Sequence, residues 1–389
     1  MKIIVVEYLN RDMNFSLWEM ENSELLASGS FDGIGSEDGR YTVLFKNEKI
    51  SENVVLNDYD DATSHLVDLL MQLDFIYSTS DIKGIGHKLS QVYSQLSNNI
   101  IFSQDSFSKL KLLDESNSKS EILGIQSFLN KFPESLNIGF FDYSFFQTME
   151  KSQFLFSVPY QWYEKYGIRK YGVDGIIHEY IFNQISDLIH VNSFKLVSCS
   201  LGDYNSICSI CDGKAVDISS GFLNPSGIIS CTSSGSIDPT IIPFVMECEG
   251  KNAGEVLDDL NNLSGVLGLS EFSDDINNIL DSIENDDKSN LALDKYIMDI
   301  VYEIAKSYVL LEGIDVLVFT SKIGENSISI RRKISEKLSC FGVKIDLDAN
   351  NICGKIQKIS SDDSKISVYV IPSNDSLAIA KKTYNMING

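Results

Sequence analysis

The chain has 389 residues, of which 43% are apolar and 22% are charged. This length allows about two to three domains, and the apolar fraction is that of a folded protein rather than a disordered chain. Lysine and arginine number 32 against 55 aspartates and glutamates, which gives a formal net charge of −23. Such a negative surface repels phosphate backbones and anionic lipids, so neither nucleic acid nor a membrane is an expected partner.

The sequence indicates a cytoplasmic location. No window reaches the roughly 18 uninterrupted apolar residues of a membrane helix, and the N-terminal MKIIVVEYLN runs into a strand-like segment instead of an export signal. The chain has seven cysteines, an odd number, and their spacing does not resemble that of a disulfide-rich protein. Free thiols in a reducing compartment are therefore favoured. Cys208 and Cys211 form a CxxC pattern within an alternating segment, which predicts ordinary strand residues; a redox pair is the alternative.

The same strand meander opens both halves of the chain. Residues 2–31 contain an apolar run, an alternating segment and a third strand, separated by polar turns, and residues 194–219 repeat this pattern. The repetition predicts a duplication into two related α/β domains. We place the first domain at residues 1–146 together with a closing helix at 377–389, and the second at residues 147–376, with a cleft between the two.

Helices and buried strands alternate after each meander. Apolar residues at helical spacing predict helices over 62–76 and 120–132, and each helix precedes a short apolar strand. The acidic stretch 254–310 is helical in period, with Ser273 as a predicted N-cap. The remaining predicted elements are the strands 82–87, 135–142, 314–320 and 367–373 and the helices 327–342 and 377–387.

Short motifs spread over nearly the whole chain are similar to those of the acetokinase family, which includes acetate and propionate kinases. The matching segments are 141–142, 147–149, 158–160, 163–172, 237–239, 241–243, 264–265, 267–268, 319–320, 323–327 and 371–374. The resemblance implies two actin-like (ribonuclease H-like) domains of duplicated fold, a cleft that holds ATP and Mg²⁺, and a homodimer built on the second domain. Family members transfer a phosphoryl group between ATP and acetate or propionate, so the resemblance implies a nucleotide and a small carboxylate as ligands.

The resemblance also assigns candidate site residues. The candidate catalytic residues are Asp142, Lys88, Asp174 and His178. The candidate cofactor-binding residues are Gly202, Asp203, Ser206, Asp275, Gly324, Glu325 and Asn326. The candidate carboxylates for a hydrated Mg²⁺ are Glu7 and Asp375. Structural alternatives stand beside several of these: Lys88 as a solvated charge, Asp275 as a carboxylate in a first helical turn, Gly324 and Asn326 as a turn, and His178 as a packed residue.

Several positions depart from the family's pattern. Lys88 stands where the family has an arginine, Ser233 replaces a second arginine, and Asp174 replaces the catalytic histidine. Gln91 and the segment 115–119 stand where the family has further histidines. A phosphoryl group in transfer spreads negative charge over its oxygens, so the site must supply cations and hydrogen-bond donors.

The phosphate-binding hairpins of the family are altered as well. Leu9 and Tyr204 stand at glycine positions, where backbone amides need free access to phosphate. Asn14 replaces a lysine, Asp203 adds a negative charge, and Lys322 stands at another glycine position.

These departures favour a catalytically impaired or inactive family member with a pseudokinase-like binding or regulatory role. Removing one stabilising group typically costs about 10²-fold or more in rate, and here several are missing together. ATP and Mg²⁺ are then cofactors only if the family's binding is retained, and otherwise there are none. The alternative is an active phosphotransferase that converts ATP and acetate, propionate or another short-chain acid into ADP and an acyl phosphate. A third, weaker hypothesis is action on a different ligand.

Overall fold

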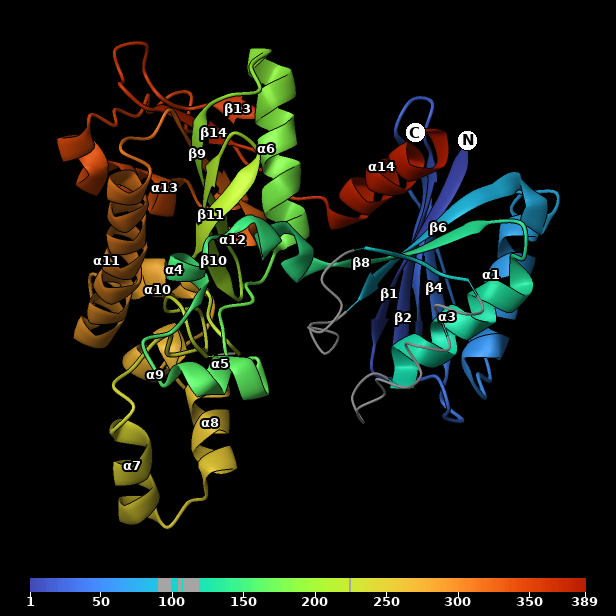
Figure 1. Ribbon diagram of the computed structural model, residues 1–389, viewed down its shortest axis with the longest axis horizontal. Coiled ribbons are helices and arrows are strands. Elements are labelled where there is room, and N and C mark those ends of the chain that lie inside the picture. Colours follow the sequence, from blue (N-terminus) through green and yellow to red (C-terminus); the bar gives the residue numbers. More distant parts are fainter. Residues whose placement is uncertain (90–98, 104–106, 108–118, 224) are drawn as a thin grey trace. The chain divides into compact units, whose positions relative to one another are not determined.

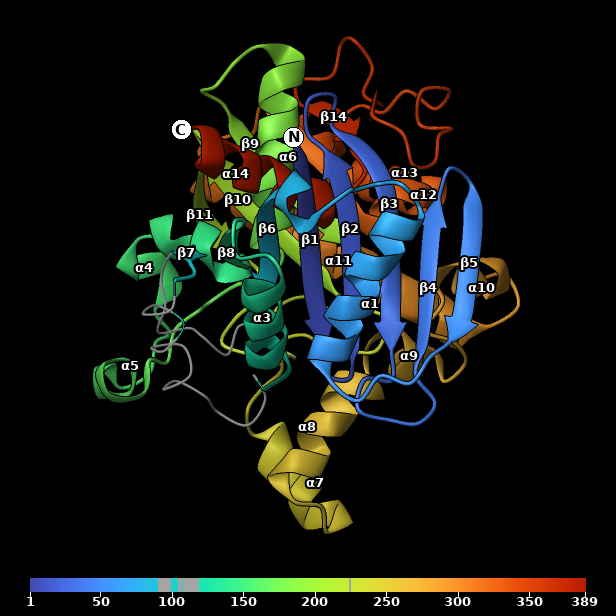
Figure 2. The same cartoon turned by 90° about the vertical axis from the view of Figure 1, so that its right-hand side faces the viewer.

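The computed structural model describes residues 1–89, 99–103, 107, 119–223 and 225–389. The contacts within the chain divide it into two compact units, which appear in Figure 1 and Figure 2. Unit 1 joins Met1–Ser144 to Asn374–Gly389, and unit 2 comprises Phe145–Ser373. Each unit is an α/β body around its own mixed sheet, as the sequence predicts.

Unit 1 is built on a sheet with the strand order β5-β4-β3-β2-β1-β6-β8-β7. The strands are β1 (Lys2–Leu9), β2 (Asp12–Glu19), β3 (Glu24–Asp32), β4 (Arg40–Phe45), β5 (Glu48–Asn53), β6 (Ile82–Leu89), β7 (Ile100–Ile101) and β8 (Leu136–Phe141). The strands from β1 to β5 form an antiparallel meander, whereas β1, β6 and β8 run parallel. The predicted meander is confirmed as β1–β3, and the sequence reading missed β4 and β5.

Helices cover both faces of this sheet. Among the residues described, the helices of unit 1 are α1 (Tyr59–Gln72), η1 (Thr79–Asp81), α3 (Lys119–Lys131) and α14 (Asp375–Asn388). Helix α14 lies close against β6 because Gly84 and Gly86 present no side chain there; a Cβ at Gly86 would lie 2.4 Å from Cγ2 of Ile379. His87 points to the other face of β6, where its ring lies edge-on to Phe128 of α3 with 5.6 Å between the ring centroids.

Unit 2 is built on a sheet with the strand order β11-β10-β9-β12-β14-β13. The strands are β9 (Lys195–Leu201), β10 (Asn205–Cys211), β11 (Lys214–Ile218), β12 (Val316–Thr320), β13 (Gln357–Lys358) and β14 (Ser367–Val370). The order β11-β10-β9-β12-β14 repeats β3-β2-β1-β6-β8 of unit 1 strand for strand, with the same parallel and antiparallel pairs. This repetition confirms the predicted duplication of the α/β fold.

Most helices of the chain belong to unit 2. They are η3 (Asp142–Thr148, which begins in unit 1), α4 (Lys151–Phe154), α5 (Tyr160–Tyr166), α6 (Gly175–Ile189), α7 (Ile241–Glu249), α8 (Ala253–Asn262), α9 (Gly265–Ser270), α10 (Ile276–Ser282), α11 (Asp287–Leu310), α12 (Ser321–Asn326), α13 (Ile328–Lys337) and η4 (Leu338–Phe341). The predicted N-cap Ser273 is wrong. Helix α10 begins after Asp275, whose carboxylate accepts a hydrogen bond from the backbone N–H of Asn277, and the Ser273 hydroxyl instead receives the N–H of Asp275.

Two further expectations can be compared with the structure. Within the residues described, no helix combines the length and the apolar character that crossing a membrane requires. All seven cysteines are free thiols. Cys208 and Cys211 both lie on β10, so they are the strand residues that the alternation predicts.

Candidate active site

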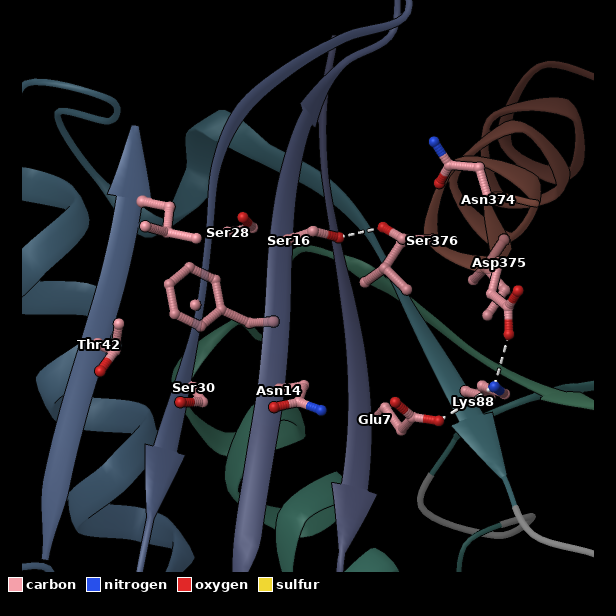
Figure 3. Close-up of a pocket in the computed structure, with 15 residues that line it drawn as sticks. Glu7, Asn14, Ser16, Ser28, Ser30, Thr42, Lys88, Asn374, Asp375 and Ser376 are labelled. Atoms are coloured by element: carbon pink, nitrogen blue, oxygen red, sulfur yellow. Dashed lines mark hydrogen bonds and ion pairs between the residues drawn. The ribbon is translucent and has the colours of Figure 1, made fainter. Parts of the chain in front are cut away.

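Three charged side chains meet near the carboxyl ends of the interior strands β1 and β6, at that edge of the unit 1 sheet. We call Glu7, Lys88 and Asp375 the ion trio (Figure 3). Glu7 on β1 and Lys88 on β6 are direct partners in the parallel register, and Asp375 opens α14. The Lys88 Nζ atom lies 3.0 Å from Oε1 of Glu7 and 2.7 Å from Oδ2 of Asp375. The sequence therefore brings residues that are far apart in the chain onto one small patch.

The ion trio keeps Lys88 charged. Burial alone would lower the pKa of the Lys88 ammonium, but the carboxylates of Asp375, Asp142 and Glu7 outweigh this effect and raise the pKa well above its usual value. Asp142 follows the end of β8, which lies beside β6, so its charge acts at the same edge of the sheet. The side chain of Lys88 is 22% exposed, so this cation is still accessible to solvent.

A cavity of about 540 Å³ extends from the ion trio across β2, β3 and β4 (Figure 3). Its polar lining consists of the ion trio, Asn14, Asn374 and the hydroxyl-bearing residues Ser16, Ser28, Ser30, Thr42 and Ser376. Lys88 is its one cationic lining residue in the part of the chain that the structure describes. An anion that enters this cavity would therefore meet its positive charge at Lys88.

The predicted Mg²⁺ ligands Glu7 and Asp375 do lie together, but Lys88 lies between them. Among the described residues, no group of three or more histidine, cysteine, aspartate and glutamate side chains could hold a metal ion. Magnesium demands an octahedral shell of oxygens at about 2.0–2.1 Å. A divalent ion bound directly between these two carboxylates does not fit the arrangement, because both already contact the ammonium. A hydrated Mg²⁺ held through water at Glu7 and Asp375 stays a prediction.

In unit 2, the candidates Asp174 and His178 belong to a chain of hydrogen bonds. The carboxylate of Asp174 accepts hydrogen bonds from the hydroxyls of Ser200 and Ser206, at 3.0 and 2.6 Å. Because the Ser206 proton goes to Asp174, the Ser206 oxygen accepts from Nε2 of His178 at 2.9 Å. Nδ1 of His178 then accepts from the hydroxyl of Ser198, also at 2.9 Å.

His178 is fully buried, and burial lowers its pKa to about 3. A neutral imidazole with no exposed surface and both nitrogens bonded cannot contact a substrate in this arrangement. Its catalytic role stays a prediction, and its burial favours the structural alternative. Asp174 differs, because it is only half-buried.

A second cavity, of about 360 Å³, brings together three of the predicted nucleotide residues. Asp203, Asp275 and Asn326 line it, with Lys322 beside them. Lys322 Nζ lies 3.2 Å from Oδ1 of Asp203, and both side chains are about three-quarters exposed. The negative charge that Asp203 adds to this hairpin is therefore matched by a positive one.

The other predicted nucleotide residues lie nearby but are already engaged within unit 2. Gly202 and Ser206 are buried, and the N–H of Gly202 donates to Oδ1 of Asn205. Glu325 accepts hydrogen bonds from the backbone N–H and the hydroxyl of Ser373, at 2.7 and 2.9 Å. Their roles in binding a nucleotide stay predictions.

Sequence reasoning missed Arg331, which holds this part of unit 2 together. The guanidinium is fully buried and donates five hydrogen bonds, to the carbonyls of Gly324, Glu325, Asn350 and Ile352 and to the Asn350 side chain. It thereby fixes the carbonyls at the end of α12, the helix that carries three predicted nucleotide residues. Its burial could have been predicted from its spacing in the sequence, because Arg331 lies on the same face of α13 as the buried residues Ile334 and Ser335.

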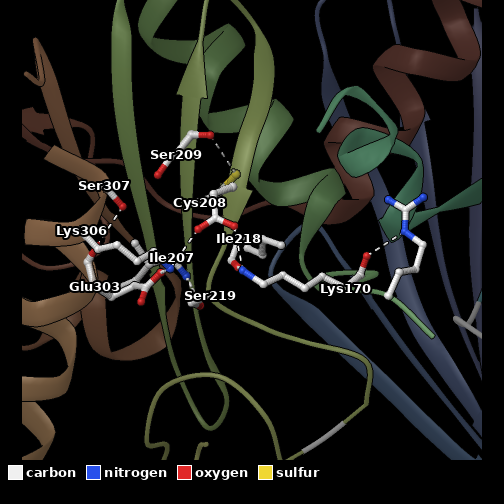
Figure 4. A network of polar contacts seen from close by, with 11 residues as sticks. Lys170, Ile207, Cys208, Ser209, Ile218, Ser219, Glu303, Lys306 and Ser307 are labelled. Atoms are coloured by element: carbon white, nitrogen blue, oxygen red, sulfur yellow. Dashed lines mark hydrogen bonds and ion pairs between the residues drawn. The ribbon is translucent and has the colours of Figure 1, made fainter. Parts of the chain in front are cut away.

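A buried ion network anchors the segment that leads to Asp174 (Figure 4). Asp217 on β11 has a side chain only 3% exposed, and it lies 2.9 Å from the ammonium groups of both Lys170 and Lys306. Lys306 also pairs with Glu303 on α11. The network ties α11 and the segment before Gly172 to the same strand.

Two further sequence-based expectations, at Gln91 and at residues 115–118, lie outside the described residues.

Comparisons with known proteins agree with the fold of two α/β units. The family model of the acetokinase family matches residues 2–381. An acetate kinase from Phytoplasma australiense is 36% identical over 384 residues, covering 98% of this chain and 97% of the relative, and one from Anoxybacillus flavithermus is 34% identical over 393 residues, covering 100% and 99%. The crystal structure of a Porphyromonas gingivalis acetate kinase superimposes with a TM-score of 0.93 at 28% identity, over 100% of both chains. A propionate kinase from Francisella tularensis gives 0.87 at 28% identity, over 99% of both chains.

Proposed function

Because the chain belongs to the acetokinase family, we propose that it is an active acetate kinase that converts MgATP and acetate into ADP and acetyl phosphate. The likeness to curated acetate kinases over 98–100% of the chain carries this proposal. Members of the family use ATP and Mg²⁺, and in this proposal the magnesium ion arrives with the nucleotide as part of the substrate.

The preferred hypothesis of an impaired or inactive member is wrong. Full-length relatives at 33–36% identity are acetate kinases, and nothing in the comparisons indicates inactivity. Part of the positive charge that the site requires is retained at the positions that depart from the family's pattern. Lys88 keeps a cation at the edge of the unit 1 sheet, and Lys322 matches the added charge of Asp203.

In the proposed reaction, Lys88 supplies the positive charge that an anionic oxygen of acetate or of the transferring phosphoryl group requires. A charged donor forms shorter and stronger hydrogen bonds than a neutral one, and it acts where negative charge develops in the transition state. Glu7 and Asp375 hold the ammonium in place from two sides. Asp142 belongs to the proposed catalytic set through its electrostatic influence on Lys88.

For the nucleotide, we propose the cavity of unit 2 lined by Asp203, Asp275 and Asn326. Carboxylate and amide side chains can accept from ribose hydroxyls and pair with a base edge. Asp174 joins the proposed catalytic set as a half-buried carboxylate that two serine hydroxyls orient.

The proposal is tested by following acetyl phosphate with hydroxylamine, using acetate, propionate and butyrate in parallel with a known acetate kinase. We expect acetyl hydroxamate to form with ATP and Mg²⁺, and less product with the longer acids. Absence of all three hydroxamates, under conditions in which the reference enzyme gives product, would contradict the proposal.

We further propose a cytoplasmic homodimer formed through unit 2, on the resemblance to the family. Light scattering coupled to size-exclusion chromatography measures the mass directly, and a single peak at the monomer mass of 43.5 kDa would exclude the dimer.

A further inference from the structure

The ion trio places an ammonium where a protein-held metal ion was expected. We propose that Lys88 is an internal cation that takes the place of a divalent ion between Glu7 and Asp375, so that the nucleotide-free protein binds no Mg²⁺ there. The inference stands apart from the proposed activity, since it concerns the protein without substrate.

The first support is the geometry of the contacts. At 3.0 and 2.7 Å, the two N···O distances are those of charge-assisted hydrogen bonds. A lysine ammonium has three N–H donors and no acceptor, so it satisfies two carboxylates at once. A metal ion entering this space must first break both ion pairs.

The second support is the charge around Lys88. Glu7 and Asp375 both pair with the one ammonium, and the negative charge of Asp142 also acts on it. Without that lysine, the carboxylates would repel one another and form an acidic cluster open to solvent, since Glu7 is 35% and Asp375 30% exposed. Such a cluster supplies the oxygen ligands that divalent cations prefer. The lysine therefore decides which kind of cation the carboxylates hold.

The third support is the way in which the fold fixes the three groups. Glu7 and Lys88 are register partners on adjacent parallel strands, and Asp375 lies in the first turn of a helix of 14 residues, where a carboxylate is favoured by the helix dipole. Regular secondary structure thus sets all three positions, and the ammonium is built into the sheet edge.

The experiment measures Mn²⁺ binding to the full chain without nucleotide, by the loss of the free-ion signal in electron paramagnetic resonance. We expect no site in wild type at up to millimolar Mn²⁺, and one site per chain in Lys88→Met with at least tenfold tighter binding. The double variant Glu7→Gln/Lys88→Met should lose the gained site. Lys295→Met is the matched control, because it removes an exposed lysine with a single carboxylate partner, Asp299, and should gain nothing.

Two results would overturn the inference. One is a folded Lys88→Met protein, checked by circular dichroism, that binds Mn²⁺ no better than wild type. The other is a site in wild type that disappears in Asp375→Asn, because the metal would then displace the ammonium. The second comparison does not need Lys88→Met, so the inference can still fail if that variant does not fold. Both readouts are independent of catalysis, so an inactive enzyme would leave them unchanged.

Discussion

The polar groups of the two units are placed differently although the two sheets share one strand order. In unit 1, the ion trio lies at a sheet edge, partly exposed and charged. In unit 2, His178 and Arg331 are fully buried, and hydroxyls, an amide and backbone carbonyls satisfy them. The two sets of groups therefore differ in kind: the ion trio of unit 1 is open to solvent, whereas His178 and Arg331 of unit 2 are sealed within the fold.

The strongest way to test this contrast is Arg331→Met in unit 2. The substitution removes five hydrogen bonds from a charged donor, each worth about 1.5–3 kcal/mol, although the carbonyls of Glu325 and Asn350 keep the N–H donors of Gly354 and Ile352. Allowing for relaxation, we expect a loss of about 3–5 kcal/mol in the free energy of unfolding, measured with urea. Arg332→Met is the neighbouring control; its exposed pair with Glu336 is worth only about 0.5 kcal/mol. Equal effects of the two variants would contradict the contrast.

Lys88→Met tests the opposite side of the comparison. We expect the rate of acetyl phosphate formation to fall about 10²-fold or more, because a donor at the developing charge is lost. The free energy of unfolding should also fall, by about 1–3 kcal/mol, because the carboxylates of Glu7 and Asp375 lose a mostly buried partner. Lys88→Arg keeps the charge and should recover most of the rate. A rate unchanged in Lys88→Met would remove Lys88 from the proposed catalytic set.

The buried histidines predict a dependence of stability on pH. Burial lowers the pKa of His178 from 6.5 to about 3, so between these values the unfolded chain binds a proton that the folded chain does not. This contribution is fully present above pH 6.5 and is lost as the pH falls toward 3, at about 1.4 kcal/mol per pH unit. His87 in unit 1 behaves alike, because burial lowers its pKa to about 4 although its Nε2 donates a hydrogen bond to Oδ1 of Asn137.

The comparison that isolates one histidine is His178→Gln against wild type, with urea unfolding measured between pH 4.5 and 6.5. The slope that the two histidines contribute should fall by about half, since His87 remains. Equal slopes for the two proteins would mean that His178 is not the neutral, buried group described above.

The smallest expected effect belongs to Lys322→Met. Its ion pair with Asp203 is exposed, so we expect no measurable change in the melting temperature. Asp203 would then face the nucleotide phosphates without its partner, and KM for ATP should rise a few-fold with kcat unchanged. Asp203→Asn in the same background should restore KM, and failure to do so would place the nucleotide elsewhere.

Much of the fold was predictable because apolar periodicity is a local signal. The two meanders, the strands around residues 82–89 and 316–320 and helix α14 all follow from it. Strand β5 was missed because its sequence, EKISEN, lacks alternating apolar residues. It lies at the edge of the sheet, where neither face has to be buried, so no apolar alternation is required.

The site was less predictable, because its ion pairs join residues that are far apart in the sequence. Motif positions assigned a metal to Glu7 and Asp375 and a catalytic role to Lys88. The structure shows that the three form one group, because β1 and β6 pair Glu7 with Lys88 and α14 brings Asp375 to them. The same holds for Lys322 and Asp203, whose charges were counted separately. A substitution that looks like a loss in the sequence can be balanced by a residue more than a hundred positions away.

Helix α14 gives unit 1 an unusual order of assembly. The ribosome makes β1 and β6 early, yet the helix that packs on both of them is made only after all of unit 2. When Ser373 has been added, every residue of unit 2 has been made, whereas Ser16, Trp18 and Lys88 of unit 1 still lack their partners Ser376 and Asp375. Unit 1 therefore begins at the N-terminus but gains its last helix only at the end of synthesis. Until Asp375 has been added, Lys88 has only Glu7 as an ion-pair partner within the ion trio.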